Sequence, residues 1–333
     1  MSARLVRLKW LSLTILVTLL LQGCSTATPS APPVSAAATT GCPDALGPIA
    51  APIVAAAGNN LIAIKENGSG QSWLLPLSQE ASAAFPSWSP DGQTLAYALR
   101  YPAPSPKLRG ITSVICGIER ATGKGRLLAA GQQDDWLDEP VWSSDGQAVL
   151  LTLTRFEPGP DQQPVDRQHV ARYDLKAGTL QVLVADAHSP APSSAGDRLL
   201  YVAVDPTSQN ETLFVARPDG QEARPLITLE RPYVSAMWPR WSPDDTRILF
   251  GASMVRGEED ERYVPAIVGA DGQGFQPLGK DLNNVVSLDW APDSRRLVYA
   301  TSGTGLFIRD LRQHEARNLT RAGDGMGVTW ARR

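Results

Sequence analysis

The chain has 333 residues, of which 43% are hydrophobic and 20% charged, and its formal net charge is -3. This is the composition of an ordinary globular protein, and a mildly acidic balance without a basic run gives little support for nucleic-acid binding. The 28 glycines and 27 prolines indicate a fold that is rich in turns.

The N-terminus, residues 1–23, has the order of a signal peptide. Residues 1–9 are basic, and the apolar stretch that follows is too short for a comfortable transmembrane helix. Residues 21–24, Leu-Gln-Gly-Cys, resemble the lipobox of bacterial lipoproteins. The resemblance implies cleavage before Cys24, acylation of that cysteine, and a lipid anchor in the cell envelope on the periplasmic or extracellular side of a membrane. The alternative is an ordinary secretory signal with an incidental cysteine.

Residues 24–42 contain Ser, Thr, Ala and Pro and no charged residue. Such a segment buries too little apolar area to offset its ordering entropy, so we expect a flexible tether. Two further cysteines remain, Cys42 and Cys116. A disulfide between them suits an extracytoplasmic compartment, and two separate thiols are the alternative, because spacing alone does not decide between them.

One five-residue motif recurs in the remaining chain, 43–333. It reads WSPDG from 88, WSSDG from 142, WSPDD from 241 and WAPDS from 290. A further copy has Pro192 in the tryptophan column, and a last start carries Trp330. Ser-Pro-Asp-Gly is a turn sequence. Two apolar residues at a spacing of two follow each turn, as Leu95 and Tyr97 do, which is typical of a strand with one buried face.

A second hairpin follows the first in each repeat, beginning near residues 61, 114, 170, 213, 267 and 306. Four antiparallel strands about every 50 residues are typical of a β-propeller. The chain starts with a second hairpin and ends with Trp330 of a first one, so pairing of the ends completes a sixth repeat. The sequence therefore predicts an all-β, six-bladed β-propeller of four-stranded antiparallel blades, closed by pairing of the N- and C-terminal strands. The recurring tryptophans are interpreted as packing residues rather than a ligand cage.

The repeat resembles that of the TolB-like β-propellers over nearly the whole mature chain. The resemblance implies the propeller fold. TolB carries an α/β domain before its propeller and is soluble, whereas a short lipidated tether takes that place here. We therefore do not extend the resemblance to the TolB role of docking to a peptidoglycan-associated lipoprotein.

No catalytic constellation is recognised in the sequence. His169, His188 and His314 lie far apart, and there is no GxSxG elbow, no CxxC pair and no metal-ligand spacing. The acid-rich segments 134–139 and 258–260 could hold calcium, but neither matches the EF-hand ligand order, so they are interpreted as solvated loops. We therefore expect no metal and no cofactor. The alternative is a propeller enzyme of the lyase, lactonase or glutaminyl cyclase type with its site at the central channel.

Long loops are predicted on one rim of the propeller. The turns 100–110, 155–168 and 253–262 share that rim with the connections 131–139 and 229–238. These segments direct arginine and aromatic residues, which suit partner binding, toward one face: Arg100, Tyr101, Trp136, Arg155, Phe156, Tyr233 and Trp238. We expect a monomeric envelope module that binds a protein, peptide or glycan. Loop variation without function and a subunit of a larger envelope complex are the alternatives.

Overall fold

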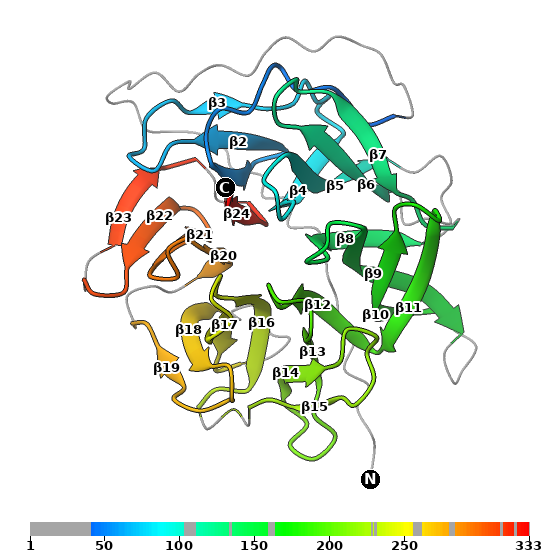
Figure 1. Cartoon of the computed structure of the whole chain (residues 1–333), viewed down its shortest axis with the longest axis vertical. Helices are drawn as coiled ribbons and strands as arrows, with labels where there is room; N and C mark the ends of the chain where they lie inside the picture. The colour runs from blue at the N-terminus through cyan, green and yellow to red at the C-terminus, as the bar shows by residue number, and fades with distance from the viewer. Residues whose placement is uncertain are drawn as a thin grey trace.

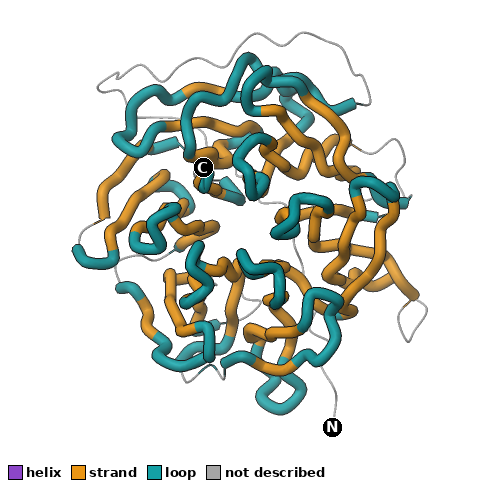
Figure 2. Tube along the Cα trace, viewed as in Figure 1, coloured by secondary structure: helices purple, strands orange, loops and turns teal. Residues whose placement is uncertain are grey.

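A computed structural model describes residues 41–102, 111–132, 135–158, 164–227, 229, 232–255, 262–279, 284–313, 316–322 and 325–332. The predicted signal segment, the predicted lipid-attachment residue Cys24 and most of the predicted tether lie outside these ranges. Regular structure in the described ranges is all strand (Figure 2). None of the described residues belongs to a helix that is long and apolar enough to cross a membrane.

The strands fall into four-stranded antiparallel units that follow one another along the chain. Unit 1 pairs β24 (Val328–Trp330), β1 (Ile53–Ala57), β2 (Asn60–Ile64) and β3 (Ser72–Trp73) in that order. Unit 2 pairs β4 (Ser82–Trp88), β5 (Thr94–Pro102), β6 (Ile111–Glu119) and β7 (Gly125–Ala129). Unit 3 pairs β8 (Trp136–Trp142), β9 (Ala148–Pro158), β10 (Pro164–Asp174) and β11 (Thr179–Ala185).

The second half of the chain repeats the pattern. Unit 4 contains β12 (Ala187–Pro192), β13 (Leu199–Val204), β14 (Glu211–Ala216) and β15 (Arg224–Pro225). Unit 5 contains β16 (Ser235–Trp241), β17 (Arg247–Ser253), β18 (Tyr263–Gly269) and β19 (Gln276–Pro277). Unit 6 contains β20 (Val285–Trp290), β21 (Arg296–Thr301), β22 (Gly305–Asp310) and β23 (Ala316–Thr320). Single residue pairs, Glu211 with Ser235 and Tyr263 with Val285, link units 4, 5 and 6.

The units are arranged in chain order around a common centre (Figure 1). The first strand of each repeat lies nearest the centre; these strands are β4, β8, β12, β16, β20 and β24 (Figure 1). The C-terminus lies next to β24 (Figure 1). β24 pairs with β1 through Trp330 with Ile53, Thr329 with Val54 and Val328 with Ala55. Strands from the two ends of the described chain thus lie in one sheet.

The repeat tryptophans are buried where neighbouring units pack. Trp88, Trp142, Trp241, Trp290 and Trp330 are 7%, 7%, 1%, 0% and 2% exposed. The indole Nε1 of Trp142 donates to the carbonyl of Ser87 in the preceding unit at 3.2 Å. Trp241 and Trp290 donate in the same way, to the carbonyls of Ala191 and Arg240 at 3.0 and 3.1 Å. Their interpretation as packing residues is confirmed.

The inner strands share a bulge next to a proline. The register shifts between Ala84 and Ser87 in β4, and equivalent shifts occur in β8, β12 and β16. The residue before each proline has a left-handed backbone: Phe85, Glu139, Ser189 and Trp238 have φ of 51°, 51°, 51° and 52°. A bulge re-aims the side chains beside it. Because this one recurs in four units, it belongs to the repeat and sets which side chains approach the centre.

The segment before β1 is part of the folded structure. Cys42 and Cys116, on β6, form a disulfide with a Cα–Cα distance of 5.6 Å across a separation of 74 residues. The carboxylate of Asp44 accepts a hydrogen bond from the backbone N–H of Gly125 at 2.7 Å, and Ile49 is only 2% exposed. The end of the expected tether is therefore attached to unit 2.

Candidate functional site

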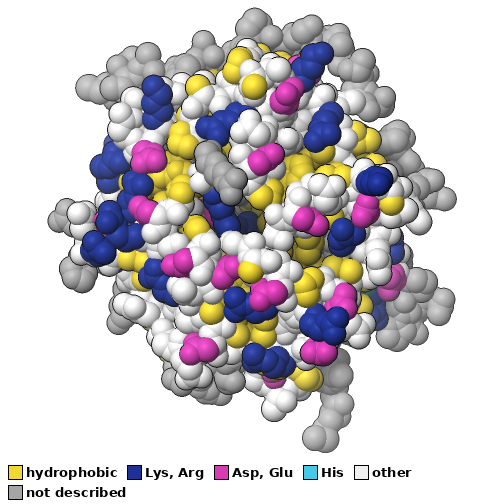
Figure 3. Space-filling view, in the orientation of Figure 1, with side chains coloured by type: hydrophobic (Ala, Val, Ile, Leu, Met, Phe, Trp, Pro, Cys, Tyr) yellow, Lys and Arg dark blue, Asp and Glu magenta, His cyan; other side chains and the backbone are white. Residues whose placement is uncertain are grey.

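Two faces of the molecule are distinguished by their connections. The turn face carries the repeat turns 89–93, 143–147, 193–197, 242–246 and 291–295. The loop face lies at the other end of the strands, where each inner strand begins and each second strand ends. In the view of Figure 3, acidic and basic side chains are interspersed among the described residues. The face seen in this view is therefore of mixed charge, without a dominant sign.

An arginine, a carboxylate and two aromatic rings meet on the loop face between units 2 and 3. Both Nε and Nη2 of Arg100, at the end of β5, donate to Oδ1 of Asp138 on β8, at 3.1 and 2.8 Å. The guanidinium carbon lies 5.3 Å from the ring centroid of Phe85 and 5.6 Å from that of Trp136. The indole of Trp136 donates to the other oxygen of Asp138 at 2.6 Å. We call these four residues the Arg100 cluster.

The Arg100 cluster is partly shielded from solvent. The side chains of Arg100 and Asp138 are 20% and 18% exposed. Burial raises the pKa of Asp138, and the attraction and hydrogen bonds of Arg100 act in the opposite direction. An arginine held in position beside two rings, with part of its surface exposed, is suited to contact a partner.

A second arginine is fixed beside the Arg100 cluster. Arg155, on β9, donates to both oxygens of Asp135 at 2.8 and 3.2 Å. Its side chain is 32% exposed, whereas that of Asp135 is 4% exposed. Hydrogen bonding to Asp135 raises the pKa of Arg155. Because Asp135 directly precedes Trp136, this ion pair extends the same surface.

A chain of hydrogen bonds crosses the inner ends of units 3, 4 and 5. The carboxylate of Glu139 accepts from the hydroxyl of Thr152 at 2.6 Å and from the backbone N–H and hydroxyl of Ser189 at 3.0 and 2.9 Å. His188 contacts the Ser189 hydroxyl through Nδ1 at 3.1 Å and Glu211 through Nε2 at 3.2 Å. The chain continues from Glu211 to Ser235 and Tyr263, each step at 3.1 Å. We call this the polar chain.

The polar chain contains a hydroxyl, an imidazole and a carboxylate in sequence, which are the components of nucleophilic catalysis. Ser189 has one hydroxyl proton, so it can donate to Glu139 or to His188, and not to both at once. Ser189 is only 1% exposed. In the structure, the polar chain joins units 3, 4 and 5 through hydrogen bonds between mostly buried groups. No group of three or more His, Cys, Asp or Glu side chains among the described residues is placed to hold a metal ion.

The predicted binding residues divide into two groups. Arg100, Trp136 and Arg155 come together as described, and Phe156 follows Arg155 on β9. Tyr101 packs against the hydrophobic core of units 1 and 2. Tyr233 lies in unit 5, where its ring makes an edge contact with Phe275 at a centroid distance of 5.3 Å.

Trp238 does not match the expectation of an accessible binding residue, because it is only 7% exposed. Its ring lies 5.1 Å from that of Tyr263. Gly251, on the adjacent strand, packs beside both rings: a Cβ there would lie 3.2 Å from Cβ of Tyr263, which is tighter than usual, and 3.4 Å from Cε3 of Trp238, which is an ordinary contact. A glycine within a strand is a signal of such close approach. Trp238 is therefore a packing residue.

Sequence reasoning missed the roles of the carboxylates Asp138, Glu139 and Glu211. The interpretation of 134–139 as a solvated loop is wrong for Asp138 and Glu139, because both belong to β8 and the Asp138 side chain is only 18% exposed. A signal for one of them was present, because Glu139 and Ser189 occupy the same repeat column, directly before a proline. Equivalent residues of neighbouring units lie side by side in stacked repeats. An acidic residue and a serine in that column therefore indicate a contact between units.

Comparison with known proteins shows the fold. No protein-family model matches the chain, and no curated protein matches it. The structure is similar to TolB from Acinetobacter baumannii, with 17% identity, a TM-score of 0.66, and coverage of 86% of this chain and 67% of that one. A putative TolB from Agrobacterium tumefaciens has 13% identity, a TM-score of 0.57, and coverage of 84% and 97%. The fold is that of a TolB-like β-propeller.

The same fold is also present in an enzyme. Kuenenia stuttgartiensis hydrazine synthase is similar to this chain with 13% identity and a TM-score of 0.62, over 87% of this chain and 47% of that one. At such identities the likeness concerns the fold, and a fold shared by different activities does not determine function. The function has to be inferred from the site.

Proposed function

We propose that the mature chain is a cell-envelope binding module that engages a protein partner through the loop face at the junction of units 2 and 3. The Arg100 cluster carries this proposal. Arginine, tryptophan and tyrosine are enriched among the few residues that carry most of the binding energy at protein interfaces. Arg100 is held by Asp138 and lies beside two rings, so it loses little conformational freedom on binding.

The proposed module is a closed six-bladed propeller anchored through Cys24. Each unit would be one blade, and the pairing of β24 with β1 would close the ring. Two contacts between units 6 and 1 support closure: Arg296 lies 5.2 Å from the ring of Trp330, and Asp289 accepts a hydrogen bond from the backbone N–H of Trp330 at 2.9 Å. Support for the anchor comes from the lipobox-like sequence at 21–24.

The binding proposal is tested by affinity capture from the native envelope. The immobilised wild-type domain is compared with Arg100→Ala and with Arg172→Ala. Arg172 is a matched control, because it also forms a half-buried ion pair, with Asp174 at 3.1 Å, but belongs to the turn-face end of β10. We expect a protein that is retained by wild type and Arg172→Ala and lost with Arg100→Ala. Equal capture by all three forms contradicts the proposal.

The anchor is tested by labelling cells with a palmitate analogue. Wild-type chain should incorporate the label, and Cys24→Ser should not, because Cys24 is the residue that follows the lipobox-like sequence. Label that persists in the Cys24→Ser chain contradicts the anchor. The proposal that the loop face binds a partner does not depend on the result of this labelling experiment.

A further inference from the structure

One arginine breaks the repeat at its innermost strand. The position directly before the tryptophan column holds, in chain order, Ser87, Val141, Ala191, Arg240, Asp289 and Thr329. Arg240 is the only basic residue in this column, and it lies on β16, one of the strands nearest the centre (Figure 1). Its backbone carbonyl accepts a hydrogen bond from the indole of Trp290 in unit 6 at 3.1 Å, so its backbone is held between units 5 and 6.

The guanidinium of Arg240 lies toward the common centre of the units. Burial lowers its pKa, the charges of Asp289 and Glu139 act in the opposite direction, and the charge of Arg332 acts in the same direction as burial. Asp289 belongs to unit 6, Glu139 to unit 3, and Arg332 follows β24 of unit 1; these units lie on different sides of the centre (Figure 1). A side chain of unit 5 is close to all three only if it points inward. Lys or Arg side chains are visible in the hollow at the centre of the space-filling view (Figure 3).

Arg240 carries a charge without a matching carboxylate. Its Nη1 donates to the carbonyl of the adjacent Pro239 at 3.0 Å, and among the described residues no carboxylate forms an ion pair with it. A guanidinium has five N–H donors and no acceptor. Because a charge that is shielded from bulk water is costly unless it is paired, the other donors of Arg240 are suited to a bound anion.

The two carboxylates nearest in charge are occupied by neutral donors. Oδ1 of Asp289 accepts from the backbone N–H of Trp290 at 2.8 Å. Its Oδ2 accepts from the hydroxyl of Thr329 at 3.2 Å and from the backbone N–H of Trp330 at 2.9 Å. Glu139 is held in the polar chain in the same way. Both carboxylates are therefore fixed in contacts between units, and neither pairs directly with Arg240.

A second arginine reaches the same stretch of β16 from the C-terminal segment. Arg332 donates through Nη1 to the Ser194 hydroxyl at 2.7 Å and through Nη2 to the carbonyl of Trp241 at 3.5 Å. Within the described ranges its acceptors, too, are neutral. Arg240 and Arg332 thus donate to the carbonyls of Pro239 and Trp241, residues that are about 7 Å apart along an extended strand. Two guanidiniums at such spacing repel one another unless an anion lies between them.

We propose that Arg240 and Arg332 together bind an oxyanion, the carboxylate or phosphate group of a small ligand, at the turn-face end of the centre. Guanidiniums bind both groups through paired N–H···O hydrogen bonds, which give geometric specificity as well as energy. The Arg100 cluster lies on the loop face, so this site goes beyond the proposed function, and neither proposal depends on the other.

The test is isothermal titration calorimetry of the purified protein with succinate and with inorganic phosphate at constant pH and ionic strength. We expect saturable binding of at least one probe and none of sodium chloride at the same ionic strength. The probe that binds more tightly shows whether the ligand group is a carboxylate or a phosphate. Arg240→Gln should weaken that binding by about tenfold or more, because it removes the charged fork of donors. Arg332→Gln should weaken it as well.

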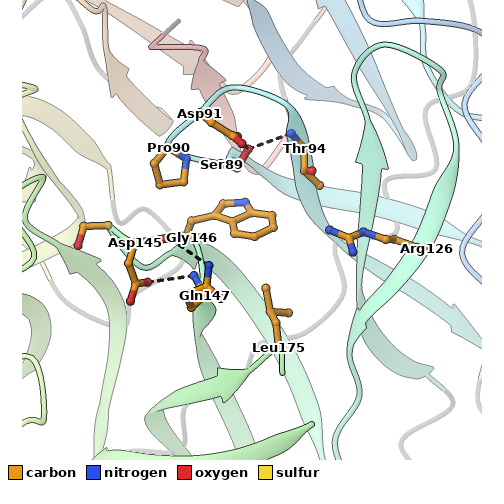
Figure 4. Close-up of a pocket in the computed structure, with 11 residues that line it drawn as sticks. Ser89, Pro90, Asp91, Thr94, Arg126, Asp145, Gly146, Gln147 and Leu175 are labelled. Carbon is orange, nitrogen blue, oxygen red and sulfur yellow. Dashed lines mark hydrogen bonds between the residues drawn. The ribbon is translucent and has the colours of Figure 1, made fainter. Parts of the chain in front are cut away.

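Arg126→Gln is the matched control. Arg126 also lies on the turn face, where it lines a pocket of about 410 Å³ between the turns of units 2 and 3 (Figure 4). Asp145 lines the same pocket, and a carboxylate repels an anion. Arg126→Gln should therefore bind both probes as wild type does.

Three results would overturn the proposal: neither probe binds saturably, Arg240→Gln and Arg332→Gln both bind as wild type does, or Arg126→Gln weakens binding as much as they do. Arg332 is exposed, so its replacement leaves the core intact. If Arg240→Gln does not fold, Arg332→Gln decides alone, and binding as in wild type then contradicts the site.

Discussion

The carboxylate of Glu139 in unit 3 accepts hydrogen bonds from both the backbone N–H and the hydroxyl of Ser189 in unit 4, at 3.0 and 2.9 Å. The two residues occupy the same repeat column and share a left-handed backbone with φ of 51°. The bulge at Glu139 directs its carboxylate toward the next unit, and the equivalent bulge at Ser189 directs the N–H that donates to it. A local backbone feature of the repeat thus produces a specific contact between units.

Removal of this carboxylate should destabilise the fold. Glu139→Ala leaves the buried N–H of Ser189 with only Thr152 as its acceptor, and a poorly satisfied buried group costs about 1–3 kcal/mol. We expect the free energy of unfolding, measured by urea denaturation, to fall by about 2 kcal/mol. Glu139→Gln retains an acceptor oxygen and should lose less. Glu222→Ala serves as the control, because Glu222 is 74% exposed; a similar loss in that variant would show that the Ser189 contact is not responsible.

Acid should destabilise the protein through its repeat turns. Hydrogen bonds from Ser143 and Ser193 hold the pKa of Asp145 and of Asp197, respectively, below the usual value. A carboxyl with a lowered pKa in the folded state contributes stability above its unfolded pKa, about 3.9 for Asp, and loses it as the pH falls through the folded value. The free energy of unfolding should therefore be steady from neutral pH to about pH 5 and decrease below about pH 4.

A serine substitution isolates the contribution of one turn. In Ser143→Ala the pKa of Asp145 should return toward its usual value, so the acid-induced loss should become shallower than in wild type. Urea denaturation at a series of pH values compares the two proteins. Parallel curves for wild type and Ser143→Ala would argue against the turn hydrogen bond as a source of the pH dependence.

The disulfide between Cys42 and Cys116 should stabilise the attachment of the N-terminal segment. Closing a loop of this length, 74 residues in sequence separation, is worth about 4 kcal/mol in the chain-entropy model. A reducing agent should therefore lower the free energy of unfolding of wild type toward that of Cys42→Ser. The same agent should leave the free energy of unfolding of Cys42→Ser unchanged. If reduction does not change the free energy of unfolding of wild type, the disulfide does not make the expected contribution.

The sequence predicted those parts of the molecule that repeat. The tryptophan column and its Ser-Pro-Asp-Gly turns gave the four-stranded units, because buried aromatics and turn residues recur at fixed spacing. The Arg100 cluster was predicted in part: Arg100 and Trp136 were identified, whereas Asp138, which holds them together, was not. Ion pairs between units depend on side-chain directions set by the bulges. Trp238 was predicted to be accessible, whereas it is buried beside Tyr263 of β18, a contact between strands that the repeat pattern does not reveal.

Closure of the ring is the prediction with the largest expected effect. β24 contributes three residues to unit 1, and Ala331 adds a backbone hydrogen bond to the carbonyl of Pro52 at 2.9 Å. Deletion of residues 327–333 removes this strand and Trp330, which is 2% exposed. Loss of a buried tryptophan alone costs about 3–5 kcal/mol. The deletion should also expose the edge of β1, which favours aggregation.

A shorter deletion separates closure from loss of a frayed end. Removal of residues 332–333 keeps β24 and Trp330 and takes away two hydrogen bonds of Arg332, to the Ser194 hydroxyl at 2.7 Å and to the carbonyl of Trp241 at 3.5 Å. That form should unfold within a few degrees of wild type, because exposed contacts contribute little to stability. Thermal denaturation and limited proteolysis compare the two deletions with wild type. If the form that lacks 327–333 melts like the form that lacks 332–333, strand pairing between the chain ends does not hold the ring, and the closed six-bladed arrangement is wrong.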